Sequence, residues 1–206
     1  RVRPILGEKM PVLPLLLAAY LLGSIPFALV SSRLFGLDDP RHYGSGNPGA
    51  TNVLRSGNKM AAMLTLVGDC AKGWLAVWGA ARLGFSPAEA ALAGFAAFLG
   101  HVFSVFLRFN GGKGVATALG VLAGIDFRIA LSALVVWLAI AFVPRYSSAA
   151  ALSAAVAAPA AGFVLLGPTP PVAILALIAT VLIWRHAPNI RKLLDGSESR
   201  IGGRKL

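Results

Sequence analysis

A glycine-rich cluster near the first quarter of the chain carries residue types that bind phosphate. Its residues are Gly44, Ser45, Gly46, Asn47, Pro48, Gly49, Ala50, Thr51 and Asn52, followed by Arg55. Glycines let the backbone turn sharply and expose N–H groups, which bind anions when several converge. The guanidinium fork of an arginine matches a phosphate group. The cluster indicates either an anion site or an ordinary turn-rich loop, and its composition leaves both open.

A second cluster lies in the middle of the chain and precedes an apolar run. Its residues are Arg108, Phe109, Asn110, Gly111, Gly112, Lys113 and Gly114. A lysine and free N–H groups at the start of a helix favour anion binding. The spacing is not that of a nucleotide-binding P-loop, because Leu107 stands where the first glycine is needed. We therefore expect an anion site without a nucleotide, with a tight turn between helices as the alternative.

The third cluster lies close to the C-terminus, and it begins where the last apolar run ends. It contains His186, Ala187, Pro188, Asn189, Ile190, Arg191 and Lys192, followed by Gly196, Glu198 and Arg200. A helical turn would align His186 with Asn189, although Pro188 argues against a regular helix. Histidine transfers protons near neutral pH. Taken alone, the cluster fits a helix end at a membrane surface better than a catalytic site.

The composition shows what must position these clusters. Of the 206 residues, 57% are hydrophobic and only 13% are charged, with a mean hydropathy of +0.74. A soluble domain is nearer half apolar and a quarter charged, so these values indicate an integral membrane protein. The net charge of +11 then reflects positively charged cytoplasmic loops and contact with anionic membrane lipid, not nucleic acid. The single cysteine excludes a disulfide within the chain, and the three histidines show no metal-ligand spacing, so we expect no metal.

Seven apolar segments follow one another, and they predict an all-α, multi-pass membrane protein with glycine-rich loops. They are residues 12–35, 60–83, 87–107, 114–125, 129–143, 147–166 and 172–184. Segment 114–125 is short, at about half a bilayer in helical length, so its crossing stays open. We expect a single domain over residues 1–206, with residues 1–9 a possible tag or non-native start.

If all seven segments cross, the three clusters share one face of the membrane. Most of the 19 lysines and arginines then lie on that face. The positive-inside rule places this face in the cytoplasm, with the N-terminus outside and the C-terminus inside. Inside the second segment, Asp69 and Lys72 have the spacing of a helical ion pair, and we expect them to give structural support. His101 is expected to bond a backbone carbonyl.

Together the three clusters resemble the motifs of the PlsY family of bacterial membrane glycerol-3-phosphate acyltransferases. The resemblance also includes Gly68, Asp69, Lys72 and Gly73, and it covers nearly the whole chain except the N-terminus. It implies a seven-helix fold in the bacterial cytoplasmic membrane, with the motifs facing the cytoplasm. It also implies an acyl phosphate donor, glycerol 3-phosphate as acceptor, and 1-acylglycerol 3-phosphate plus phosphate as products, the first step of bacterial phospholipid synthesis. No cofactor is expected, because acyl phosphate is already an activated anhydride.

The resemblance supports Ser45, Arg55, Lys113, His186 and Asn189 as residues that bind glycerol 3-phosphate. Among them, we expect Ser45, Lys113, His186 and Asn189 to take part in catalysis. Residues of the glycine loops are expected to bind the acyl phosphate, namely Gly49, Thr51, Asn52, Asn110, Gly111, Gly112 and Gly114. Glu198 is expected to support the structure, together with Asp69, Lys72 and His101.

The base that accepts the proton stays open between His186 and a substrate phosphate oxygen. Direct attack is favoured over an acyl-Ser45 intermediate, because no base lies beside Ser45 in the sequence. No histidine is followed by an aspartate five positions later, which argues against the acyltransferase type that uses acyl-CoA or acyl carrier protein. A small transporter or a binding protein for phosphorylated or lipid-like anions is the alternative class.

Overall fold

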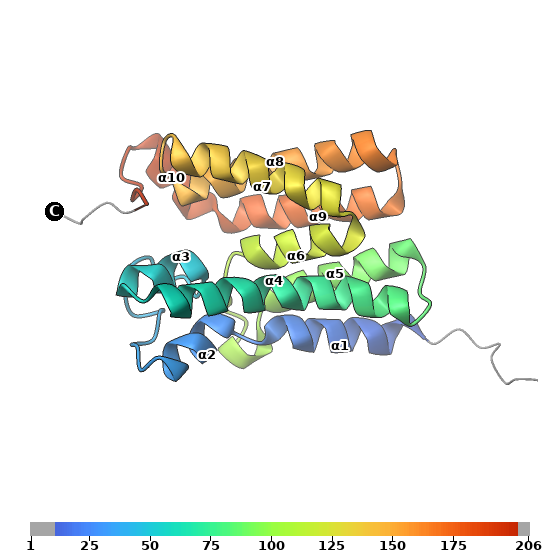
Figure 1. Cartoon of the computed structure of the whole chain (residues 1–206), viewed down its shortest axis with the longest axis horizontal. Helices are drawn as coiled ribbons and strands as arrows, with labels where there is room; N and C mark the ends of the chain where they lie inside the picture. The colour runs from blue at the N-terminus through green and yellow to red at the C-terminus, as the bar shows by residue number, and fades with distance from the viewer. Residues whose placement is uncertain (1–10, 202–206) are drawn as a thin grey trace, which may run out of the picture.

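The apolar segments of the chain form helices that lie side by side along one long axis (Figure 1). The computed structural model describes residues 11–201, and these contain no β-strand. Residues 1–9, expected as a possible tag, lie outside this range. The helices are α1 (Val12–Ser24), α2 (Phe27–Leu34), α3 (Ala50–Val53), α4 (Lys59–Arg82), α5 (Pro87–Val102), α6 (Val115–Ile125), α7 (Phe127–Phe142), α8 (Ser147–Leu166), α9 (Pro170–Arg185) and α10 (Ala187–Leu194). Two 3₁₀ turns are η1 (Leu54–Ser56) and η2 (Val105–Leu107).

The connections alternate between the two ends of this bundle. Loop 35–49, the short turn at 143–146 and the segment after α10 lie at the left end in Figure 1, whereas loop 103–114 lies nearer the middle of the long axis. The turns at 83–86, 126 and 167–169 lie at the opposite end. The first and third polar clusters are therefore brought to the same end of the molecule, and the second lies further along the bundle toward its middle (Figure 1).

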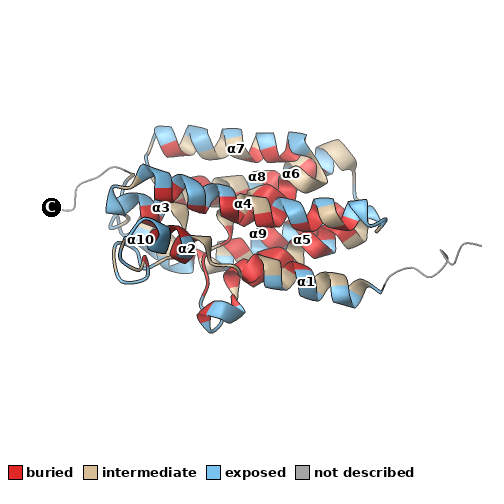
Figure 2. Ribbon diagram, turned by 60° about the horizontal axis from the view of Figure 1, so that its bottom comes forward, coloured by how far each residue is buried: buried red, intermediate tan, exposed pale blue. Residues whose placement is uncertain are grey.

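Four helical stretches of the described residues are long and apolar enough to cross a membrane, or five when α9 and α10 are taken as one bent span. Helices α6 and α7 are shorter apolar helices, so the count of seven crossings stays a prediction. Large apolar side chains such as Val164, Val135 and Met63 point outward. Alanine-rich faces fill the interior, where the buried residues are concentrated (Figure 2). This distribution suits a multi-pass protein whose outer surface faces lipid.

The structure differs from the predicted segments in three places. The first segment is split into α1 and α2 at Ile25 and Pro26, because proline lacks the N–H that would continue the helix. The third segment ends as an α-helix at Val102, and only a 3₁₀ turn follows. The basic tail contains α10, with Pro188 in its first turn, where a helix tolerates proline because those N–H groups have no partner within the helix.

Glycines allow two pairs of helices to approach closely. A Cβ on Gly73 of α4 would lie 2.2 Å from the carbonyl oxygen of Thr117 in α6. On the facing helix, a Cβ on Gly120 would lie 1.9 Å from the carbonyl oxygen of Cys70. Gly23 of α1 and Gly100 of α5 meet in the same way. Small residues at such crossings let backbones pack directly, which is how helices associate in membranes.

A buried cluster of charged and polar side chains ties α4 to α5 and to the break after α1. Lys72 lies 2.8 Å from Asp69 Oδ1 and donates a hydrogen bond to the Ile25 carbonyl oxygen over 2.9 Å. The predicted pairing of Asp69 with Lys72 is therefore present. His101 differs from the expectation, because its Nδ1 faces Asp69 Oδ1 at 3.4 Å in place of a backbone carbonyl. A carboxylate oxygen accepts from a ring N–H as a backbone carbonyl does, so Asp69 takes the place expected for the carbonyl.

Candidate active site

The second and third clusters meet through Lys113 and Asn189. The ammonium group of Lys113 donates a hydrogen bond to Asn189 Oδ1 over 2.5 Å, although the two residues are 76 positions apart. Asn189 Nδ2 donates in turn to Glu198 Oε1 over 2.8 Å. This arrangement fixes the amide, with its oxygen toward the lysine and its nitrogen toward the carboxylate. A cation and a polar amide are thus held together at the end of the bundle.

Loop 103–114 reaches this position because it folds back on the end of α5. The N–H of Gly111 donates to the Val102 carbonyl and the N–H of Gly112 to the His101 carbonyl, each over 3.1 Å. A Cβ on Gly111 would lie 2.0 Å from the His101 oxygen, so only glycine fits. Gly114 has a φ of +83° and directly precedes α6. The helix therefore begins immediately after Lys113 and Gly114.

These contacts correct one expectation about the donor phosphate. The N–H groups of Gly111 and Gly112 already have partners within the fold, and the N–H of Gly49 donates to the Asn47 carbonyl over 2.9 Å. They are not free to bind an anion in this conformation. The glycines serve the close packing of the loop, and phosphate contacts are left to side chains and other N–H groups.

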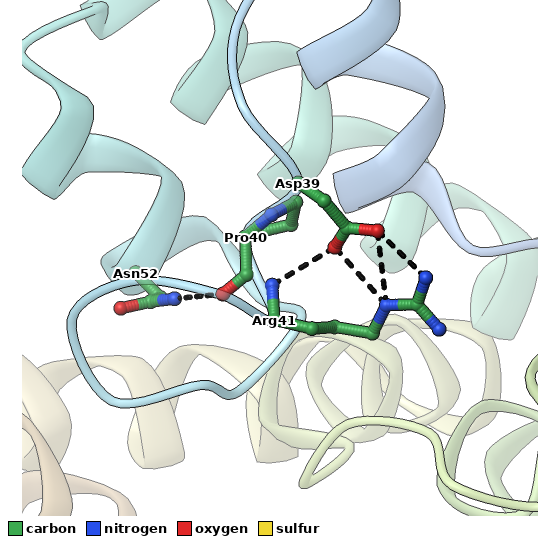
Figure 3. Close-up of polar contacts among 4 residues, drawn as sticks. All are labelled: Asp39, Pro40, Arg41 and Asn52. Atoms are coloured by element: carbon green, nitrogen blue, oxygen red, sulfur yellow. Dashed lines mark hydrogen bonds and ion pairs between the residues drawn. The ribbon is translucent and has the colours of Figure 1, made fainter.

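The first cluster is folded around Asn52. This side chain is only 2% exposed. Its Nδ2 donates to the carbonyl of Pro40 (Figure 3). Nδ2 also donates to the Tyr43 carbonyl, and Oδ1 accepts from the N–H of Ser45. Both amide hydrogens are used, so Asn52 supports the loop and offers no donor to the acyl phosphate. In the same loop, the Arg41 guanidinium binds Asp39 and lowers the pKa of that carboxyl to about 2.

Arg55 brings the first cluster to the third. Its guanidinium donates to Ser199 Oγ over 2.7 Å. Thr51 contributes a second link, with its hydroxyl 3.4 Å from that of Ser147 at the start of α8. The exposed Ser45 accepts a long bond from the N–H of Asn47, and the exposed Asn110 donates to the Arg108 carbonyl. Ser45 and Asn110 therefore bond within their own loops, while Arg55 and Thr51 reach across to other elements.

His186 lies at the junction of α9 and α10 and is 2% exposed. Its Nδ1 is 2.8 Å from the carbonyl oxygen of Leu182. A carbonyl only accepts, so Nδ1 carries the hydrogen, and a neutral ring then has a free lone pair on Nε2. Burial lowers the pKa of His186 to about 4, with the positive charges of Lys113 and Arg185 adding to the effect. The ring is therefore neutral at physiological pH and has the tautomer of a base.

Burial also lowers the pKa of Lys113. The nearby cations Lys192, Arg185 and Arg55 act in the same direction, and the carboxylate of Glu198 opposes them. The end of the bundle thus gathers more positive than negative charge around a half-buried lysine. Such a site attracts an anion, whose charge would stabilise the ammonium form.

Ser148 is a site residue that sequence reasoning missed. It lies in the first turn of α8, is buried, and donates to Glu198 Oε1 over 2.7 Å. Two serines before an alanine-rich run are also an ordinary helix start, so the pattern carried no functional signal. The corner before α8 holds the end of the chain as well, because Arg145 exchanges two hydrogen bonds with Ile201.

Comparisons with known proteins identify the family of this chain. The family model described as "Glycerol-3-phosphate acyltransferase" matches residues 13–196. A protein of that name from Aromatoleum aromaticum is 80% identical over 196 residues, which cover 95% of this chain and all of the relative. Another from Paraburkholderia phytofirmans is 55% identical over 191 residues, covering 91% of this chain and 89% of the relative.

Two crystal structures of PlsY, an integral membrane glycerol 3-phosphate acyltransferase, share the fold. They are the glycerol 3-phosphate form, with a TM-score of 0.87, and the lysophosphatidic acid form, with a TM-score of 0.86. Each is 40% identical to this chain, and the match covers 92% of this chain and 94% of the other. The chain belongs to the glycerol-3-phosphate acyltransferase family of integral membrane enzymes.

Proposed function

We propose that this enzyme transfers a fatty acyl group from acyl phosphate to the sn-1 hydroxyl of glycerol 3-phosphate. The products are 1-acylglycerol 3-phosphate and inorganic phosphate. The observation that carries the proposal is the contact of Lys113 with Asn189, which joins two polar loops at one end of an apolar bundle. A water-soluble anion and a lipid-like donor meet most readily at such an end, because the polar site lies beside apolar helix surfaces.

The acceptor phosphate is assigned to Lys113, Asn189 and Arg55, with Ser45 and His186 at the same end of the bundle. Lysine and arginine form charge-assisted hydrogen bonds with phosphate. Lys113 and Arg55 each hold a neutral partner now, Asn189 and Ser199 respectively. A phosphate can therefore take up both cations without breaking an ion pair.

The donor phosphate is assigned to Thr51, to Gly114 at the start of α6, and to the exposed amide of Asn110. Thr51 lies in the first turn of the short helix α3, and its hydroxyl already reaches toward α8. The acyl chain would lie against the apolar outer surface of the helices, where each buried CH₂ contributes about 0.8 kcal/mol.

In the reaction, the acceptor hydroxyl attacks the acyl carbonyl directly. The bond from the sn-1 oxygen to the acyl carbon forms, and the bond from that carbon to the donor phosphate oxygen breaks. The hydroxyl proton goes either to His186 Nε2 or to an oxygen of a substrate phosphate. A phosphate oxygen can accept it because the second pKa of a phosphate group lies near 6. Holding two anions in register and stabilising the developing oxyanion supply most of the rate. No covalent acyl-enzyme is required.

We also place the site in the cytoplasm and the protein in the bacterial inner membrane. The support is that the loops and the tail that carry the site hold more lysine and arginine than the turns that follow α4, α6 and α8. Labelling with a membrane-impermeant thiol reagent tests this in a Cys70→Ala background. Ser197→Cys should react only from the cytoplasmic side and Leu83→Cys only from the opposite side, and the reverse pattern would contradict the orientation.

A donor panel tests the function. Purified enzyme in detergent is given glycerol 3-phosphate with palmitoyl phosphate, palmitoyl-CoA or palmitoyl acyl carrier protein. We expect lysophosphatidate only from palmitoyl phosphate. Incubation with the donor alone should leave the protein mass unchanged. Product from the thioester donors would refute the donor assignment, and a stable mass increase of one acyl group would refute direct attack.

A further inference from the structure

A line of four side chains runs from α8 to the lysine of the second loop. Ser148 donates to Glu198 Oε1 over 2.7 Å, and Asn189 Nδ2 donates to the same oxygen over 2.8 Å. Asn189 Oδ1 then accepts from Lys113. These residues come from three separate parts of the chain, and only Ser148 lies on a long bundle helix.

The direction of the Asn189 amide depends on its two neighbours. The two ends of an amide have nearly the same shape, so hydrogen-bond partners decide which way it faces. The carboxylate of Glu198 only accepts, which directs Nδ2 toward it and leaves Oδ1 for Lys113. An amide oxygen cannot bind a phosphate oxygen, because both only accept, but the three hydrogens of the Lys113 ammonium can reach Asn189 Oδ1 and a substrate phosphate together.

Glu198 itself lies in the irregular segment after α10, at Asp195–Arg200 in the chain, and needs an anchor. Its N–H donates to the Lys192 carbonyl over 3.0 Å, which holds the backbone but not the carboxylate. The hydroxyl of Ser148 holds the carboxylate, and it does so from a buried position on α8. Ser148 does not cap its own helix, because the residue before the first turn is Tyr146 and no side chain caps that end.

We propose that Ser148 is a positioning residue for acceptor binding, acting through Glu198 and Asn189 to hold the Lys113 ammonium toward the substrate phosphate. The inference rests on the proposed acceptor site and adds to it a residue outside the three polar clusters. It predicts that the hydroxyl of Ser148 matters only while the Glu198 carboxylate is there to receive it.

The test is the binding of glycerol 3-phosphate to purified protein in detergent, measured by isothermal titration calorimetry without any donor. Ser148→Ala should weaken binding about tenfold, since a hydrogen bond to a charged group is lost. Ser148→Thr keeps the hydroxyl and should bind like the wild type. Ser153→Ala, on a later turn of the same helix, is the matched control and should also bind like the wild type. The melting temperature of each variant is recorded alongside.

The Glu198→Ala background decides whether Ser148 acts through Glu198. There, adding Ser148→Ala should change binding by less than about twofold, because the two residues work as one unit. The proposal would be overturned if the losses of affinity in Glu198→Ala and Ser148→Ala multiplied in the double variant. It would also be overturned by a Ser148→Ala protein that binds like the wild type. Equal weakening in Ser148→Ala and Ser148→Thr would also overturn it, since the hydroxyl would then not be the cause. A wild type that binds no glycerol 3-phosphate would instead refute the acceptor site of the proposed function.

Discussion

Lys113 and Asn189, 76 positions apart in the chain, form a 2.5 Å hydrogen bond between two polar segments. The lysine precedes α6, and the asparagine lies in the first turn of α10. Neither segment by itself forms a complete phosphate site. The bond shows that the fold assembles the site from separate polar segments, and the predictions below follow from that assembly.

Removing either partner should disable the acceptor site. Lys113→Ala and Asn189→Ala are each expected to lower kcat/KM for glycerol 3-phosphate by about 100-fold, near the upper range for a hydrogen bond to a charged group. The double variant should be little worse than the worse single variant. Steady-state kinetics in detergent measures this, and fully multiplicative losses would mean that the two residues act independently.

The pH dependence of activity should report the low pKa of His186. If its Nε2 is the base, the acidic limb of kcat/KM lies near pH 4 to 5, and the rate is flat from there to neutrality. His186→Ala should then lose most of its kcat. An acidic limb near pH 6 together with a nearly normal kcat in His186→Ala would assign the proton to a substrate phosphate instead.

The same group makes folding stability depend on pH. The pKa of His186 falls from 6.5 to about 4 on folding, so protonation favours the unfolded chain. The stabilisation by the neutral ring is complete above pH 6.5 and is lost as pH falls toward 4, by a few kcal/mol in all. Thermal unfolding between these pH values should therefore show a smaller loss for His186→Asn than for the wild type. Parallel curves would contradict the buried neutral ring.

Removing one partner of the buried Asp69–Lys72 ion pair should destabilise the fold more than removing both charges. Lys72→Met leaves the Asp69 carboxylate buried without its main partner, and breaking such a pair costs about 3–5 kcal/mol. Adding Asp69→Asn removes that charge and should restore part of the melting temperature. If the double variant is less stable than Lys72→Met, the charges do not depend on each other.

The glycines of loop 103–114 should be intolerant of even a methyl group. Gly111→Ala places a Cβ 2.0 Å from the His101 carbonyl oxygen, so the loop and Lys113 must move. We expect a loss of kcat/KM of about tenfold or more, because small displacements of a catalytic group are costly. Gly79→Ala is the control, since nothing lies within 4 Å of a Cβ there and alanine favours a helix. Normal activity in Gly111→Ala would show that the loop packing does not position Lys113.

Much of the fold could be predicted because membrane-spanning helices consist of long runs of apolar residues. Helices α4, α8 and α9 begin and end within a few residues of the expected segments. The break at Ile25 and Pro26 and the helix α10 were missed, because proline has opposite effects inside a helix and in its first turn. The number of crossings stays a prediction, because α6 and α7 are short apolar helices and their length does not show whether they cross the membrane.

The site residues were easier to select than to assign. Cationic and polar side chains at loop ends pointed to Lys113, Arg55 and Asn189, and the structure brings these loops together. The sequence favours Gly49, Gly111, Gly112 and Asn52 as phosphate ligands, but in the structure their hydrogen bonds lie within the fold. Sequence shows which groups are present but not which of them are already bonded within the fold. Ser148 could not be selected from the sequence, because its partner Glu198 lies 50 positions away in the chain.

The most direct test of the account measures both products of the reaction in one experiment. Wild type and Lys113→Ala are supplied with palmitoyl phosphate, with and without glycerol 3-phosphate, and phosphate and lysophosphatidate are followed together. We predict acceptor-dependent release of one phosphate per lysophosphatidate in the wild type, and loss of both in Lys113→Ala with the fold intact. Folded wild type that releases no phosphate in response to the acceptor, or a Lys113→Ala protein as active as the wild type, would contradict it.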